Sequence, residues 1–193
     1  MDASRPVLSA GRRFHLLRHF PDVAPDYAAR TLPGVPLEEA RAQTRLPGSK
    51  FLPEFAADPD EALARVLEAA GRPEAPPSAG DGRIEVRAVF SAADWPGGIG
   101  FDGLIALDAL PAGTRIRREE RSGFPVTVAV LVEPPRTRQA NLILLRGDGG
   151  LLEVLTLFPG TAAPPFPDPA VHDGDRLEEC RRFWDAHALI AAE

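Results

Sequence analysis

The chain has 193 residues, of which 44% are hydrophobic and 26% charged, and this length is enough for one domain that buries its own core. No apolar run reaches the roughly 18 residues of a membrane span, and the N-terminal stretch lacks the apolar core of a signal peptide, so we expect a cytoplasmic protein with no membrane partner. A net charge of -6 argues against a general affinity for nucleic acid, and a single cysteine, Cys180, excludes a disulfide framework.

Residues 1–72 are expected to form a helical part, and the stretch RRFHLLRHF at 12–20 carries two histidines, His15 and His19. Four residues apart on a helix, they would share a face, which is a zinc-binding spacing. No glutamate follows His15 and no third ligand is near, so we expect no metal and no cofactor. The alternative for both histidines is a purely structural role.

The next candidate is the loop LPGSKFLPEF, which carries Ser49 and the only lysine, Lys50. A lysine here could neutralise a phosphate, or it could be a solvated loop residue. A helix is predicted directly after this loop. Asp58 is a suitable N-cap, Pro59 suits the first turn and Gly71 follows the end.

Residues 73–82 have the composition of a linker loop, and residues 83–158 change to the alternating, β-branched pattern of strands. GDGG at 147–150 predicts a hairpin between 141–146 and 151–158. We therefore expect an α+β fold in which N-terminal helices pack on one curved antiparallel sheet of five or six strands. Residues 1–193 would form a single domain.

Two features of the strand region could carry chemistry. Thr156 lies near the end of an expected central strand, where a hydroxyl can face a concave sheet surface, although threonine is also an ordinary strand residue. If the basic run at 115–121 forms an edge strand, Arg115 and Arg117 lie on the face opposite Arg118, although such charges can also serve only to discourage association between sheets. The glycine run at 96–103 leads into a strand and does not open a helix, so it does not predict a nucleotide-binding loop.

The C-terminal region contains a proline-rich loop and a last helical pattern. Prolines between 159 and 173 end the sheet, because proline cannot donate to a strand ladder. Apolar residues then recur with helical spacing, so we expect one closing helix over 174–192 that covers the sheet.

Taken in order, the segments HLLRHF, SKFLPEF, GIGFDGLIAL and LTLFPG resemble the ribonuclease domains at the C-termini of bacterial contact-dependent toxins, in the broad barnase, EndoU, colicin and RelE group. The resemblance covers about residues 13–160 and implies a helical N-terminal half with a curved antiparallel sheet. It also implies RNA as substrate and an immunity protein, or another protein, as partner.

The resemblance implies catalytic roles for His19, Ser49 and Thr156, and Arg18 would bind the substrate. Lys50 and Arg117 are the other basic residues that we expect to bind phosphate. In the implied metal-independent reaction a base takes the proton of the ribose 2'-hydroxyl, whose oxygen attacks phosphorus, and an acid protonates the departing 5' oxygen. A histidine with a near-neutral pKa suits this chemistry.

Two other functions stay open from the sequence. The first is a non-enzymatic binding or accessory domain, which would use its sheet and the proline-rich loop to contact a protein. The second is a small-molecule binding or hydrolytic pocket lined by aromatic residues, namely Phe101, Phe124, Phe158 and Trp184.

Overall fold

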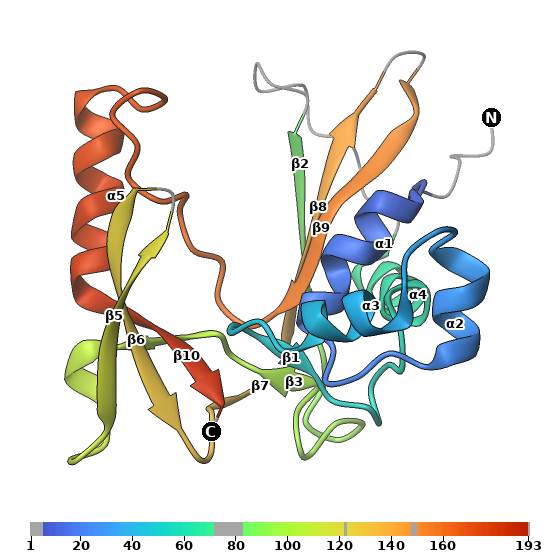
Figure 1. Ribbon diagram of the computed structural model, residues 1–193, viewed down its shortest axis with the longest axis horizontal. Coiled ribbons are helices and arrows are strands. Elements are labelled where there is room, and N and C mark those ends of the chain that lie inside the picture. Colours follow the sequence, from blue (N-terminus) through green and yellow to red (C-terminus); the bar gives the residue numbers. More distant parts are fainter. Residues whose placement is uncertain (1–5, 72–82, 122, 148–149, 193) are drawn as a thin grey trace.

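The computed structural model describes residues 6–71, 83–121, 123–147 and 150–192, so the predicted linker at 73–82 lies outside the described residues. Figure 1 shows two parts side by side, joined at one end of the molecule. The class is α+β, as predicted, but the strands of the described residues form three sheets instead of one.

The larger part contains the N-terminal helices and the sheet of β2, β8 and β9. The helices are α1 (Ala10–Leu16), the 3-10 turn η1 (Leu17–His19), α2 (Pro25–Thr31), α3 (Leu37–Thr44) and α4 (Pro59–Ala70). The strands are β2 (Arg83–Val89), β8 (Gln139–Arg146) and β9 (Leu152–Pro159). All pairs are antiparallel with β8 in the centre, which confirms the hairpin of β8 and β9.

Helix α4 begins and ends where the sequence predicts. The carboxylate of Asp58 accepts hydrogen bonds from the backbone nitrogens of Asp60 and Glu61, and Gly71 follows the last turn with a φ of 72°. One stripe of the helix is buried against the sheet, including Ala62 and Val66. Helices α1 and α4 thus cover one face of the β2–β8–β9 sheet and leave the other face toward the smaller part (Figure 1).

The smaller part is a four-stranded sheet with one helix on it. Its strands are, in spatial order, β4 (Leu104–Ala106), β10 (His187–Ala192), β6 (Phe124–Leu131) and β5 (Arg115–Arg121). Helix α5 (Gly174–Ala186) covers this sheet. The 3-10 turn η2 (Leu107–Ala109) directly follows β4. Strand β5 is at the edge, where its charged side chains discourage association with another sheet.

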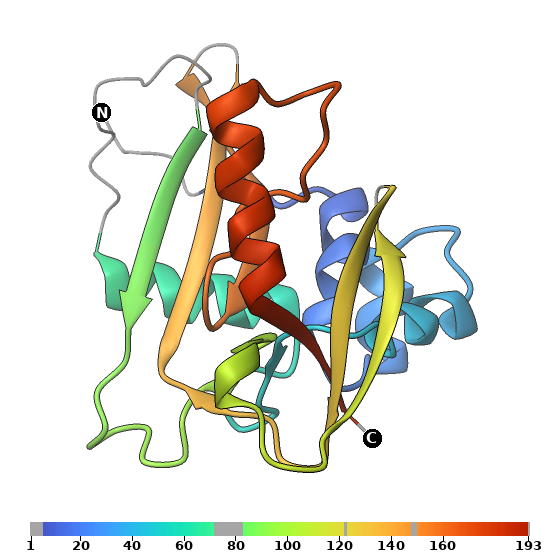
Figure 2. The same cartoon turned by 90° about the vertical axis from the view of Figure 1, so that its left-hand side faces the viewer.

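The prediction of one helix over 174–192 is wrong at its second half. Helix α5 ends at Ala186, and the chain continues as β10, which pairs in parallel with β6 and antiparallel with β4 (Figure 2). Ala188 and Ile190 are buried in this position. Inter-strand pairing therefore overrides the helical propensity of the sequence, and the sheet is mixed instead of antiparallel.

A third small sheet and a few loop contacts join the two parts. The sheet consists of β1 (Lys50–Phe51), β3 (Gly100–Phe101) and β7 (Arg136–Thr137), with β3 in the centre. Beside it, the backbone nitrogen of Gly48 donates to the oxygen of Ile190 at 3.1 Å, and the nitrogen of Ile190 donates to the oxygen of Gly103 at 2.9 Å. Strand β10 is thereby tied to the loop before β1.

Separate apolar cores stabilise the parts. The largest lies between α1, α4 and the β2–β8–β9 sheet and contains Phe20, Phe51 and Phe55. Another lies between α5 and the smaller sheet, around Trp184 and Val128. No helix in the described ranges combines the length and the apolar character needed to cross a membrane.

Candidate functional site

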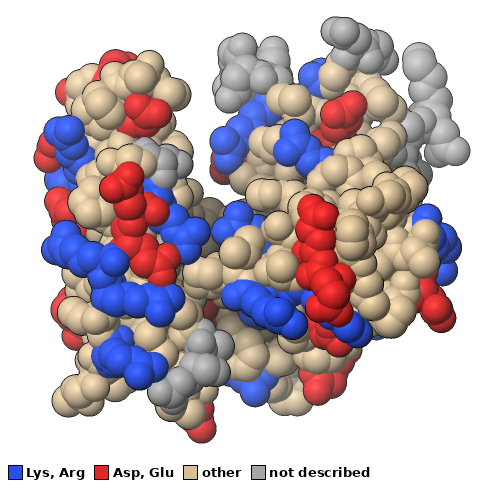
Figure 3. Space-filling model, in the orientation of Figure 1, with Lys and Arg blue, Asp and Glu red and all other residues tan. Residues whose placement is uncertain are grey.

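A cleft of about 630 Å³ lies between the two parts. Figure 3 shows the molecule hollowed there, with basic side chains on both sides of the hollow. The larger part contributes His15, Arg18, His19, Ser49, Thr156 and Phe158 to the lining, and the smaller part contributes Leu104, Arg121, Trp184, Leu189 and the loop 163–166.

Four of the residues predicted to act on a substrate line this cleft together: Arg18, His19, Ser49 and Thr156. They come from the turn η1, the loop before β1 and strand β9, which are far apart in the sequence. The histidine at the other end of the HLLRH stretch, His15, lines the cleft as well. The spacing of the two histidines thus places both at one site.

The imidazole of His19 is held by the loop before β1. Its Nδ1 lies 3.0 Å from the backbone oxygen of Ser49 and 3.2 Å from the hydroxyl oxygen of the same residue. A carbonyl oxygen can only accept, so this contact assigns the proton to Nδ1. Nε2 makes no hydrogen bond to any described residue, and it therefore carries a free lone pair.

The pKa of His19 lies well below the near-neutral value expected from the sequence. Burial lowers this pKa to about 3, the hydrogen bond to the Ser49 backbone raises it in part, and the nearby charges of Arg18 and Lys50 lower it further. The imidazole is consequently neutral at pH 7 in the free protein, which is the form that accepts a proton.

Thr156 reaches the cleft because of an irregularity in β9. The register between β8 and β9 shifts between Ile143 and Leu144, which leaves Leu155 as an extra residue. Val154 and Leu157 are then both buried in the core, and Thr156 faces the cleft. Strand β9 is an outer strand of its sheet, where the sequence predicted a central one.

Two arginines from opposite parts line the cleft. Burial lowers the pKa of Arg18, and the positive charge of Arg121 lowers it further. Arg121 is held by Glu119, with Nη2 2.6 Å from the carboxylate, while its Nε is buried and has no hydrogen-bond partner among the described residues. Both arginines thus bring positive charge to the lining of the cleft.

The sequence pattern did not identify Arg121 as a residue of this cleft. It occupies the last position of β5, on the same face as Arg117 and Glu119 because side chains alternate along a strand. Extending this alternation to the end of the basic run would have found it. Arg117 itself is exposed, pairs with Glu119 at 2.7 Å and does not line the cleft.

Lys50 also lies outside the cleft lining. Its Nζ donates to the backbone oxygens of Arg18, of Thr44 at 2.6 Å and of Leu46 at 2.9 Å. Burial lowers the pKa of Lys50 to about 8. The lysine thus ties the turn η1 to the end of α3, directly beside the residues that line the cleft.

Two glycines allow close packing of the backbone near the cleft. A side chain at Gly103 would collide with the backbone nitrogen of Ser49, and one at Gly160 would collide with Asp102. The Asp102 carboxylate accepts hydrogen bonds from the backbone nitrogen and the hydroxyl of Thr161, the latter at 2.7 Å. The segment that follows β9 is thus fixed close to β3.

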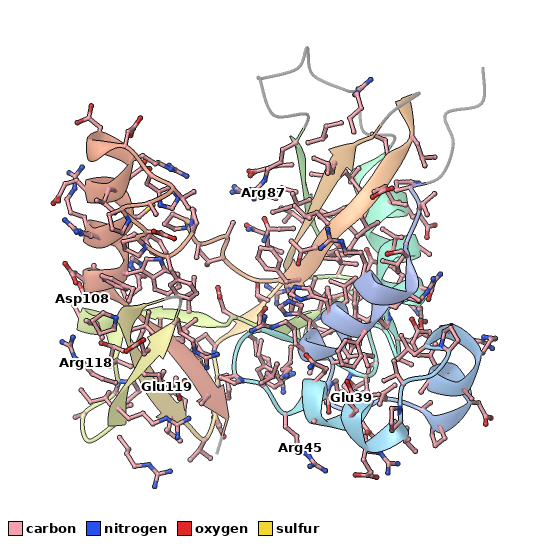
Figure 4. The ribbon with its side chains drawn as sticks, turned by 45° about the horizontal axis from the view of Figure 1, so that its top comes forward. Glu39, Arg45, Arg87, Asp108, Arg118 and Glu119 are labelled. Carbon is pink, nitrogen blue, oxygen red and sulfur yellow. The ribbon has the colours of Figure 1, made fainter. Side chains whose placement is uncertain are left out.

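A second groove lies at strands β2 and β8. Arg87 is paired with Asn141, which is paired with Phe158, so these three side chains share one face of the sheet. Figure 4 shows Arg87 on the side of β2 that faces the smaller part and Arg118 on the outer side of β5. The groove has Arg87, Asn141 and Ala162 in its lining and is separate from the cleft between the two parts.

Only part of the predicted aromatic pocket lines the cleft. Phe158 and Trp184 do so, whereas Phe101 lies under the guanidinium of Arg136, 4.3 Å from its carbon, and Phe124 packs in the core of the smaller part. Residues 163–166 of the proline-rich loop form a wall of the cleft.

Within the described ranges, no group of three or more histidine, cysteine, aspartate or glutamate side chains has the arrangement of a metal site. His172 accepts a hydrogen bond from the backbone of Asp168 and does not line the cleft. Comparison with known proteins found no matching family model, no matching curated protein and no matching solved structure.

Proposed function

We propose that this protein is a metal-independent endoribonuclease and that the cleft between its two parts is the active site. The supporting observation is the meeting of His19, Arg18 and Arg121 in one cleft, because a neutral imidazole beside two guanidinium groups suits a phosphodiester that carries a neighbouring hydroxyl. Ser49 and Thr156 add hydroxyls to the same cleft.

In the proposed reaction Nε2 of His19 takes the proton of the ribose 2'-hydroxyl. The 2' oxygen forms a bond to phosphorus, and the bond from phosphorus to the 5' oxygen breaks. Water protonates the departing oxygen, so the products are a 2',3'-cyclic phosphate and a 5'-hydroxyl. Arg18 and Arg121 stabilise the charge that develops on the phosphoryl oxygens, and the hydroxyl of Thr156 orients the phosphate.

The low pKa of His19 in the free protein fits this order of events. The cations Arg18 and Lys50 contribute to keeping the imidazole unprotonated. A bound phosphate offsets the charge of Arg18, which raises the pKa of His19 toward the value at which a base accepts a proton effectively. Substrate binding therefore activates the base.

The test is cleavage of a fluorescently labelled single-stranded RNA by the purified protein in excess EDTA. We expect cleavage with cyclic phosphate ends, no cleavage of the all-deoxy oligonucleotide, and a loss of at least about 100-fold in His19→Ala, the range for removal of a general base. His172→Ala is the matched control, since this histidine lies outside the cleft. Equal rates for His19→Ala and the unaltered protein would contradict the proposal.

A further inference from the structure

The lining of the cleft has two chemically different parts. One is the guanidinium groups of Arg18 and Arg121, and the other, here called the apolar end, is the side chains of Leu104, Phe166, Trp184 and Leu189, which belong to one core cluster. The cationic and apolar groups belong to one continuous cavity. A ligand that fills it would combine an anionic group with an apolar one.

The apolar end is preformed. The indole nitrogen of Trp184 donates to the backbone oxygens of Pro164 and Pro165, at 3.3 and 3.2 Å, and the ring of Phe166 packs on the indole with centroids 4.6 Å apart. At its start the same loop is held by Asp102 through Thr161. A half-buried aromatic ring is thus fixed at the wall of the cleft before any ligand binds.

We propose that this apolar end is a nucleobase subsite, which takes the base of a nucleotide next to the phosphate held by Arg18 and Arg121. The inference rests on the proposed function and names its substrate class as single-stranded RNA with an unstacked base. Bases in single-stranded RNA stack on aromatic side chains, and the cavity volume lies within the range of about 300–1,000 Å³ that is usual for small-ligand sites.

Recognition at this subsite is by stacking and not by reading the edge of the base. Two polar side-chain groups at this wall of the cleft are already engaged, since the indole nitrogen of Trp184 binds the proline carbonyls and the hydroxyl of Thr161 binds Asp102. All bases have a face that can stack, so the subsite accepts each of them. A base held in a duplex cannot enter, and double-stranded RNA is a poor substrate.

Binding can be measured through Trp184 itself. The chain has two tryptophans, so a Trp95→Phe background leaves Trp184 as the only indole. The probe is a 2'-O-methyl tetranucleotide, which lacks the attacking hydroxyl, and its partner probes carry one abasic position each. We expect quenching of the Trp184 fluorescence, a Kd about tenfold higher for one abasic position, and similar Kd values for all bases at that position.

A pair of phenylalanine variants tests the same subsite. Phe166→Leu removes the aromatic face at the cleft, and we expect a Kd about tenfold higher. Phe183→Leu is the matched control, because Phe183 also packs on Trp184, with centroids 5.5 Å apart, but does not line the cleft. The abasic probes measure the contribution of the base to binding without any substitution in the protein.

The outcomes separate the two proposals. Cleavage of RNA with equal Kd values for intact and abasic probes overturns the base subsite and leaves the ribonuclease standing, as does equal cleavage of single- and double-stranded RNA. Base-dependent binding without cleavage supports the subsite and overturns the catalytic proposal. A cleft that binds neither probe and cleaves nothing overturns both.

Discussion

The Nδ1 atom of His19 lies 3.0 Å from the backbone oxygen of Ser49, and this contact fixes which imidazole nitrogen is free to act. The acceptor is a backbone atom, so it survives any substitution at Ser49. The hydroxyl of Ser49, at 3.2 Å, adds to the contact but is not needed to assign the proton. The two groups of Ser49 can therefore be separated by experiment.

Substitution of Ser49 by alanine is expected to lower kcat only a few-fold, since the backbone acceptor remains. His19→Asn is its counterpart, because the amide can still donate to the Ser49 oxygen while no base remains at the position of Nε2. We expect kcat for RNA cleavage to fall at least about 100-fold in His19→Asn with little change in the thermal midpoint. A comparable loss in both variants would instead assign the essential contact to the Ser49 hydroxyl.

Arg121 and Arg117 lie on the same face of β5, and both contact Glu119, but only Arg121 lines the cleft. Arg121→Ala is expected to weaken RNA binding and to reduce the slope of log Kd against log salt concentration by about one, because one phosphate contact is lost. Arg117→Ala should leave both quantities unchanged. A salt slope that falls equally in the two variants would show that the whole strand, and not the cleft, attracts RNA.

Lys50 is predicted to contribute to stability and not to bind RNA. Lys50→Met leaves the backbone oxygens of Thr44, Leu46 and Arg18 without their donor, and we expect a loss of about 2 kcal/mol in the free energy of unfolding. The control is Arg45→Met, an exposed residue just after α3 (Figure 4). Urea titrations should separate the two variants, and the salt slope of RNA binding should be unchanged in both.

Local signals predicted a large share of the fold and of the candidate site. Helix α4 has its N-cap, its proline and its glycine within the helix or directly beside it, so its bounds could be predicted without knowledge of contacts to distant segments. The hairpin of β8 and β9 is a similar case, since its turn residues follow each other in the chain. His19, Ser49 and Thr156 were identified from a resemblance, and the structure places them in one cleft, whereas their roles stay predictions.

The features that were missed depend on contacts between distant segments. The stretch HALIAA fits a helix as well as a strand, and its pairing with β6 and β4 decides for the strand. The contacts of Lys50 could not be predicted from the sequence, because its acceptors come from η1 and α3. The low pKa of His19 likewise results from burial, which a sequence pattern does not report.

This low pKa makes stability depend on pH. His19 takes up a proton near 6.5 when the chain is unfolded and only at about 3 in the folded protein, so between these values the unfolded state binds more protons. The contribution of His19 to stability is therefore complete above pH 6.5 and is lost as the pH falls toward 3. Urea titrations at pH 7.5 and pH 5 should show a larger loss in the unaltered protein than in His19→Asn, and equal losses would contradict the burial of a neutral imidazole.

The hydroxyl of Thr156 is available to a ligand, since it makes no hydrogen bond to another described residue although the side chain lines the cleft. Thr156→Val keeps the shape of the side chain and its strand propensity, so the free energy of unfolding should change by less than about 0.5 kcal/mol. Loss of a hydrogen bond to a charged phosphate should lower kcat/KM about tenfold or more. Thr127→Val on β6, outside the cleft, is the matched control. Equal kcat/KM values in the two variants would show that the Thr156 hydroxyl does not contact the substrate.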